Sequence, residues 1–166
     1  MKVLVLIISF LLCTSLFGQN PSGFDKMVGK YVKGTVELID PSDCGGENVI
    51  FLDAREIEEF ETSHIKDAKY VGYDNFSLEA VETIPKNSKI IVYCSIGYRS
   101  EKIGEELLEL GFTDVYNLNG GIFNWSNNGY PVFNNDSRTK EVHGYSRSWS
   151  KWLNTNRVEV VTGKKK

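Results

Sequence analysis

The segment Ile90-Ile91-Val92-Tyr93-Cys94-Ser95-Ile96-Gly97-Tyr98-Arg99-Ser100 carries the strongest structural signal in the chain. Its first four residues form a short apolar run, which is typical of a strand buried on both faces. Ser100 opens a segment with helical spacing that extends to Leu110, and we expect Ser100 to be its N-cap. A strand, a tight loop and a helix N-terminus in this order direct backbone N–H groups and the positive end of a helix dipole toward Cys94.

Cys94 is the candidate nucleophile of this segment. The dipole, the loop amides and Arg99 together predict a thiol whose pKa lies below the ordinary value of about 8.5. The alternative is that Cys94 is a small apolar residue closing a core strand. Gly97, which permits a backbone conformation closed to other residues, and Arg99 favour the nucleophile.

Strand-like and helix-like segments alternate on both sides of this loop. We expect strands at 36–39, 49–52, 68–71, 90–93 and 115–118, a loop at 41–46, and helices at 24–32, 57–60, 77–84, 100–110 and 121–127. This order predicts an α/β domain in which helices flank a mainly parallel sheet. Ligands of such sheets bind beyond the carboxyl ends of the strands, which is where both Cys94 and residues 53–55 fall.

The first 19 residues resemble a secretory signal, with Lys2, an apolar run and Gly18 in the expected order. This predicts an exported protein, periplasmic or extracellular, without stable membrane insertion after cleavage. A transmembrane anchor is the alternative, although the run is short and lacks a basic flank. Lipoprotein processing at Cys13 is disfavoured because no small residue directly precedes it.

The remaining chain divides into a domain at 20–132, including the leading helix, and an extension at 133–166. Tyr145, Trp149 and Trp152 lie at the spacing of a short amphipathic helix packing back on the domain, with a partner-binding tail as the alternative. The run Lys164-Lys165-Lys166 is expected to be a solvated, frayed end.

Composition and cysteine usage restrict the function further. The chain has 166 residues and a formal net charge of −3, which fits one compact domain and does not indicate a nucleic-acid partner. Cys44 precedes one predicted strand and Cys94 follows another, so in a parallel sheet about 15 Å of strand separates them, too far for a disulfide. We therefore expect two free thiols, of which only Cys94 is reactive.

Four motifs in order resemble the single-domain rhodanese-type sulfurtransferases. They are Asp53-Ala54-Arg55-Glu56 with Phe60, His64-Ile65-Lys66-Asp67-Ala68, Cys94 through Ser100, and Gly120-Gly121-Ile122-Phe123-Asn124-Trp125 with Gly129-Tyr130-Pro131-Val132. The resemblance covers about 49–132 and implies a rhodanese-like three-layer fold. The family's active loop has six residues, matched by Cys94 to Arg99, whereas related dual-specificity phosphatases have one more.

The resemblance implies that Cys94 takes a sulfane sulfur from thiosulfate or a small persulfide and passes it, as a persulfide, to cyanide or a thiol, without a metal or cofactor. A thiol-redox protein is a further expected partner, and nucleic acid is not. The expected anion-binding residues are Ser95, Ile96, Gly97, Tyr98, Arg99 and Ser100, with Arg55 as a further candidate. The alternatives are a catalytically silent partner-binding module and, less favoured, a phosphatase or arsenate reductase.

Other polar residues of the motifs have mainly structural explanations. Asp53 is expected to satisfy loop amides, and Arg55 to pair with acids across the fold if it does not touch substrate. His64 is expected to be a hydrogen-bonded turn residue, and Trp125 a core residue. Ser95 departs from the basic residue that many family members carry after the cysteine.

Overall fold

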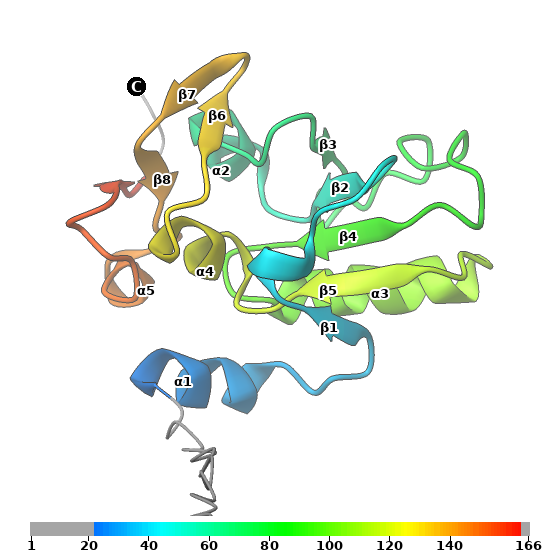
Figure 1. Ribbon diagram of the computed structural model, residues 1–166, viewed down its shortest axis with the longest axis horizontal. Helices are drawn as coiled ribbons and strands as arrows, with labels where there is room; N and C mark the ends of the chain where they lie inside the picture. Colours follow the sequence, from blue (N-terminus) through cyan, green and yellow to red (C-terminus); the bar gives the residue numbers. More distant parts are fainter. Residues whose placement is uncertain (1–21, 164–166) are drawn as a thin grey trace, which may run out of the picture.

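A computed structural model describes residues 22–163 of the chain (Figure 1). The predicted signal segment with Cys13, and the run Lys164 to Lys166, lie outside these residues. Within them, no helix is both long enough and apolar enough to cross a lipid bilayer.

A five-stranded parallel sheet forms the centre of the molecule (Figure 1). Its strands lie in the order β1 (Glu37–Ile39), β5 (Val115–Leu118), β4 (Ile90–Tyr93), β2 (Ile50–Asp53) and β3 (Lys69–Tyr70). β4 is central because it pairs with β2 on one side and β5 on the other, with Asp53 opposite Tyr93 at the carboxyl end. The predicted α/β fold with a mainly parallel sheet is confirmed.

The two faces of β4 pack into two separate cores, which explains its continuous apolar sequence. Ile91 and Tyr93 lie in a core with α1 (Gly23–Tyr31), α4 (Gly121–Asn127) and the C-terminal extension. Ile90 and Val92 lie in the other core, against α3 (Tyr98–Glu109). All four side chains are fully buried. Successive side chains of a strand point to opposite faces, so a strand covered on both sides is apolar at every position.

The start of α3 differs from the prediction. The helix begins at Tyr98 and is capped by Gly97 in a left-handed conformation with φ of 111°, so Ser100 is not its N-cap. Glycine adopts this conformation without a steric penalty, which lets the chain turn two residues earlier than expected. The Ser100 hydroxyl instead donates to Oδ1 of Asn117 on β5, at 2.8 Å.

The helix predicted at 77–84 is absent, and the segment forms consecutive turns. Its backbone bonds link residues three apart, from Val81 N–H to the Leu78 carbonyl and from Ile84 N–H to the Val81 carbonyl. Pro85 disfavours helical geometry at Ile84, and the Ser77 hydroxyl accepts from the Ala80 N–H. The apolar residues of this segment are nevertheless buried, because Val81 and Ile84 pack against the sheet. The helix predicted at 57–60 does form, as α2 (Ile57–Thr62).

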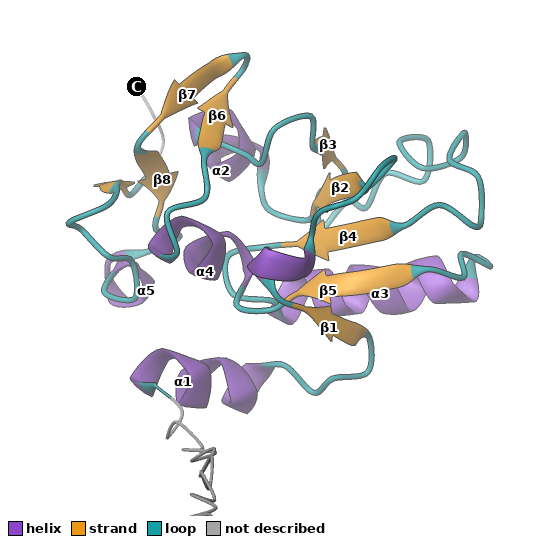
Figure 2. Ribbon diagram, in the orientation of Figure 1, coloured by secondary structure: helices purple, strands orange, loops and turns teal. Residues whose placement is uncertain are grey.

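The C-terminal extension contains strands that the sequence did not predict (Figure 2). β6 (Val132–Asn134) and β7 (Ser137–Thr139) form an antiparallel hairpin, and β8 (Glu141–His143) pairs in parallel with β9 (Glu159–Val161). The expected amphipathic helix is reduced to the single turn α5 (Arg147–Ser150). The extension still packs on the domain, because Val142, Leu153 and Val158 are buried in the core with α1 and α4.

Candidate active site

Cys94 lies at the carboxyl end of β4, in the loop that leads to α3. Its side chain is 1% exposed, and its sulfur accepts a hydrogen bond from the Gly97 N–H at 3.2 Å. This contact requires the loop to curl around the thiol, which the left-handed backbone of Gly97 allows. The loop therefore presents the sulfur to backbone donors, as the sequence predicted.

α4 holds this loop from behind. Its first amides donate to the loop carbonyls, Ile122 N–H to Cys94 at 2.9 Å and Phe123 N–H to Ser95 at 3.1 Å. The approach is so close that a Cβ at Gly121 would overlap the Cys94 carbonyl oxygen. Gly121, the first residue of α4, is thus explained by the backbone contact that fixes the nucleophile loop.

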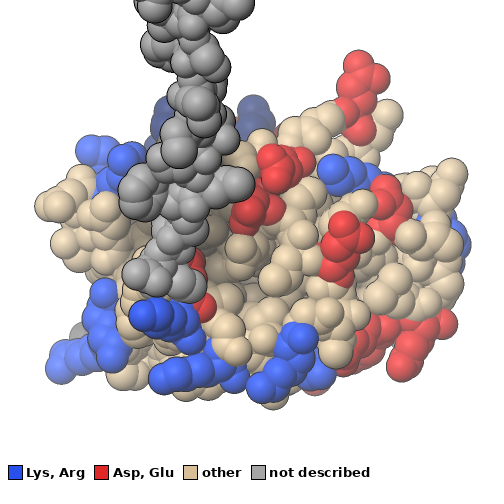
Figure 3. Space-filling model, turned by 60° about the horizontal axis from the view of Figure 1, so that its bottom comes forward, with Lys and Arg blue, Asp and Glu red and all other residues tan. Residues whose placement is uncertain are grey.

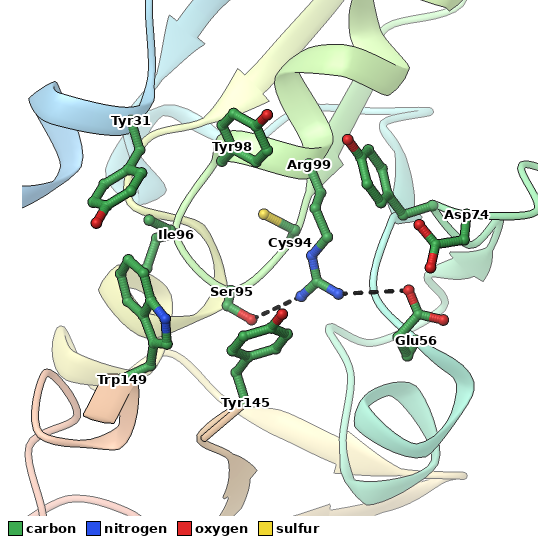
Figure 4. A pocket seen from close by; sticks show the side chains of 11 residues that line it. Tyr31, Glu56, Asp74, Cys94, Ser95, Ile96, Tyr98, Arg99, Tyr145 and Trp149 are labelled. Carbon is green, nitrogen blue, oxygen red and sulfur yellow. Dashed lines mark hydrogen bonds and ion pairs between the residues drawn. The ribbon is translucent and has the colours of Figure 1, made fainter. Parts of the chain in front are cut away.

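Arg99 is held beside the thiol by a bidentate ion pair with Glu59 of α2. The Arg99 Nη1 and Nη2 atoms lie 2.7 and 2.9 Å from the two Glu59 carboxylate oxygens. Ser95 completes the network, because its hydroxyl donates to Glu59 at 2.9 Å and accepts from Arg99 at 3.0 Å. Glu56 is a weaker partner at 3.8 Å (Figure 4). The bidentate geometry fixes the guanidinium more firmly than a single contact would.

The electrostatics of this network distinguish the two cysteines. Burial alone would raise the pKa of Cys94, but the positive charge of Arg99 and hydrogen bonds from Ser100 and Gly97 lower that pKa below its ordinary value. Burial raises the pKa of Cys44 to about 11. Both thiols are free, as predicted. Of these two thiols, Cys94 is therefore the one that ionises more readily.

A cavity of about 530 Å³ opens above Cys94, and five of its eleven lining residues are Tyr or Trp. In Figure 4 the Cys94 side chain lies below Tyr98 and above Ser95 and Tyr145, with Arg99 to its right. The lining residues are Tyr31, Glu56, Tyr73, Asp74, Cys94, Ser95, Ile96, Tyr98, Arg99, Tyr145 and Trp149. A pocket of this volume accepts a small organic molecule.

Segments before and after the central sheet both contribute to the cavity wall. Tyr31, at the end of α1, and Trp149, in α5, pack edge to face with ring centroids 5.2 Å apart. Tyr145 lies over the Arg99 guanidinium at 5.2 Å from the ring centroid to Cζ. A ring over a guanidinium is a favourable cation–π arrangement. The aromatic wall over the thiol is therefore built by segments outside the α/β domain core.

Arg55 does not line this cavity. Its side chain is fully buried and binds the Asp53 carboxylate at 2.6 Å and the Ser63 carbonyl at 2.6 Å. His64 bonds the Phe60 carbonyl at 3.0 Å, and Trp125 is buried and donates to the Pro131 carbonyl. Arg55, His64 and Trp125 therefore stabilise the loops around the site, in the structural roles that the sequence predicted for them.

Several residues of the site had little or no signal in the sequence. Glu59 had a weak one, because it stands three residues after Glu56 in a helix-capping arrangement. Tyr31, Tyr73 and Asp74 had none, since only the tertiary structure brings them to the cavity. Among residues 22–163, no group of three or more His, Cys, Asp or Glu side chains could hold a metal ion.

Comparison with known proteins identifies the relatives of the chain. A model of the rhodanese-like domain matches residues 36–128. The tRNA uridine(34) hydroxylase of Buchnera aphidicola subsp. Schizaphis graminum is 34% identical over 122 residues, which cover 68% of this chain and 38% of that protein. The enzyme of the same name from Yersinia pestis is 32% identical, covering 66% and 32%. The chain thus spans about a third of the length of these curated relatives.

Solved structures show the same fold. A rhodanese-related protein from Thermoplasma volcanium superposes with a TM-score of 0.53 at 26% identity, covering 58% of this chain and 96% of that chain. A thiosulfate sulfurtransferase from Pseudomonas aeruginosa gives 0.53 at 25% identity, covering 59% of this chain but only 20% of its own.

The comparisons correct two predictions. The curated relatives are named for hydroxylation of a tRNA uridine, not for transfer of sulfur from thiosulfate or a persulfide. The prediction of a sulfurtransferase acting through cyanide or thiol acceptors was therefore wrong, as was the exclusion of a nucleic-acid partner. The loop spacing defines an activated thiol but not its substrate, which depends on what surrounds that thiol.

The names of the relatives support an enzyme, and the family is shown by the match over more than half of the chain together with the fold. This chain belongs to the rhodanese-like domain family.

Proposed function

We propose that the chain is a tRNA-modifying enzyme in which the Cys94 thiolate attacks a uridine ring. The observation that carries the proposal is an activated thiol at the floor of a 530 Å³ cavity with aromatic walls. Aromatic side chains stack on nucleobases, and enzymes that modify a base commonly hold it unstacked in such a pocket. The names of the relatives, which refer to a uridine of tRNA, support this choice of substrate.

The chemistry follows from the electron demand of the uracil ring. The thiolate adds to C6, the C5–C6 π electrons move into an enolate, and C5 becomes nucleophilic. A peroxide is the co-reactant: C5 takes one oxygen as a hydroxyl group while the O–O bond breaks and hydroxide leaves. Hydroxide removes the C5 proton as water, the C6–S bond breaks, and the thiolate is restored. Uridine and peroxide thus yield hydroxyuridine and water.

The residues around Cys94 have distinct parts in this scheme. The charge of Arg99 and hydrogen bonds from the N–H groups of Gly97 and Ser100 lower the pKa of the thiol and so favour its ionised form. Tyr145 and Trp149 provide flat surfaces for the base, and each such stack is worth about 1–3 kcal/mol. Ser95 orients Arg99 by accepting a hydrogen bond from it directly and by donating one to its partner Glu59.

The proposal is tested with an anticodon stem–loop RNA, prepared once with uridine and once with 5-fluorouridine at position 34. Fluorine cannot leave C5 as a proton, so a covalent complex between RNA and protein should accumulate in the presence of peroxide. With uridine, digestion and mass spectrometry should show a gain of about 16 Da on one nucleoside. Both products should vanish in Cys94→Ser and persist in Cys44→Ser. The proposal is contradicted if the unaltered chain forms neither product. It is also contradicted if Cys94→Ser forms both products in equal amounts to the unaltered chain.

A further inference from the structure

A second cavity, of about 410 Å³, lies between the end of α4, the β6–β7 hairpin and the segment before β9. Its lining includes Arg138, Lys140 and Arg157 and contains no acidic residue. The carboxylates nearest in sequence, including Asp136 and Glu159, are not part of the lining. We call this space, defined by Ser126, Arg138, Lys140 and Arg157, the basic cavity.

The three cations of the basic cavity lack counter-charges. Within the described part of the chain, Arg138, Lys140 and Arg157 form no ion pair with an acid, whereas Arg55 and Arg99 do. Like charges gathered in one concave space repel one another unless an anion lies between them. The cavity therefore has the charge of an anion site.

A buried hydroxyl provides independent support. Ser126 lies at the inner wall with 2% of its surface exposed, and its Oγ has no hydrogen-bond partner among residues 22–163. Buried polar atoms are nearly always paired, so an orphan at a cavity wall indicates a missing ligand atom. A phosphate oxygen would accept from this hydroxyl.

Arg157 is placed in the cavity by the backbone of Gly129. Gly129 has φ of +85°, and a Cβ at this position would come within 2.6 Å of the Arg157 Nη1 atom. The guanidinium thus lies close beside the main chain of Gly129 at the wall of the cavity. A guanidinium at this wall suits the planar, bidentate recognition of phosphate.

Positive charge is also concentrated in the C-terminal extension. Residues 36–128 contain 18 Asp and Glu against seven Lys and Arg, whereas residues 133–163 contain three against five. On the face in Figure 3, Lys and Arg gather along the left and lower-left edge and Asp and Glu lie more to the right. A polyanion would be repelled by the domain and attracted by the extension.

We propose that the basic cavity binds a phosphate group of the RNA backbone. The extension lines both cavities, with Tyr145 and Trp149 over Cys94 and Arg138, Lys140 and Arg157 in the basic cavity. One RNA could therefore place a base over the thiol while its backbone is held by the same segment. The identification of the phosphate as RNA rests on the proposed function.

The test is the salt dependence of RNA binding by the full chain. Fluorescence anisotropy of a labelled anticodon stem–loop is measured between 50 and 200 mM KCl, a range chosen because phosphate contacts respond strongly within it. Each phosphate contact in a single strand contributes about 0.7 to the slope of log K against log salt. We expect Arg157→Gln and Lys140→Gln each to lower the slope by about that amount. Lys69→Gln, an equal loss of charge on the exposed edge strand β3, should leave it unchanged.

Ser126→Ala distinguishes a ligand contact from a structural role. Because the hydroxyl has no partner in the described chain, its removal should leave the melting temperature unchanged or higher while RNA affinity falls. The inference is overturned if the cavity variants bind RNA as well as the unaltered chain does. It is also overturned if Lys69→Gln lowers the slope as much as the cavity variants do.

Cys94→Ser separates this inference from the proposed function. It leaves the basic cavity intact and should bind RNA with the unaltered slope. If RNA binding depends on the basic cavity but no modified uridine forms, the inference holds and the proposed chemistry is overturned. If modified uridine forms but RNA binding does not depend on the basic cavity, only the inference is overturned. Absence of RNA binding by the unaltered chain, with binding of inorganic phosphate that the cavity variants lose, overturns RNA as the source of the phosphate.

Discussion

Glu59→Gln removes the acid that fixes Arg99 beside the candidate nucleophile. Glu59 is 2% exposed, and both of its carboxylate oxygens bind the Arg99 guanidinium. Burial opposes its ionisation, but the hydrogen bond and charge of Arg99 overcome this and lower the pKa of Glu59 from 4.5 to about 2. Glu56, at 3.8 Å and with 44% of its side chain exposed, is poorly placed to replace it.

The pKa difference sets the size and pH dependence of the effect. A lowering of about 2.5 pKa units corresponds to about 3 kcal/mol of folding free energy when Glu59 is ionised in both states. Because the folded pKa lies below the unfolded one, this stabilisation is complete above about pH 5 and is lost as pH falls through about 2. By pH 3, less than about half of it remains.

Urea unfolding provides the assay. With a slope of about 2 kcal/mol per molar urea, Glu59→Gln should lower the midpoint by about 1.5 M at pH 7 and by clearly less at pH 3. Glu61→Gln, on the same helix but exposed, is the matched control and should shift the midpoint little at either pH. A Glu59→Gln effect that is the same at pH 3 and pH 7, or no larger than that of Glu61→Gln, refutes the reasoning.

Three further predictions concern the thiols and the loop. Arg99→Met should raise the pKa of Cys94, because a stabilising cation is lost, and should slow its alkylation by iodoacetamide at pH 6 about tenfold or more; an unchanged rate would show that the loop amides suffice. In the unaltered chain, peptide mapping after brief alkylation at pH 7 should find label on Cys94 and not on Cys44, whose pKa is about 11, and equal labelling would contradict this assignment. Gly121→Ala should lower stability by roughly 1–3 kcal/mol or more in thermal unfolding, because its Cβ meets the Cys94 carbonyl, whereas Gly45→Ala, with open space around it, should be nearly neutral.

Much of the central domain could be predicted because its signals are local. The apolar run at 90–93 is explained by a strand with a core on each face, and the alternation of short strands and helices indicated a parallel sheet. The position of Cys94 at the carboxyl end of that strand followed directly, since it depends only on chain order. The helix at 77–84 failed because Pro85 and short-range side-chain bonds outweighed a correct apolar spacing.

The surroundings of the thiol could not be predicted in the same way. Glu59 reaches Arg99 from 40 residues away, and Tyr31 meets Trp149 from the opposite end of the chain. The basic cavity likewise joins Ser126 to Arg157 across a hairpin that the sequence did not reveal. The local sequence therefore determined the scaffold and the nucleophile, because hydrophobic periodicity and chain order act over a few residues. Only the tertiary structure decided the walls, the charge partners and the second cavity, because these depend on which distant side chains share one space once the core has closed.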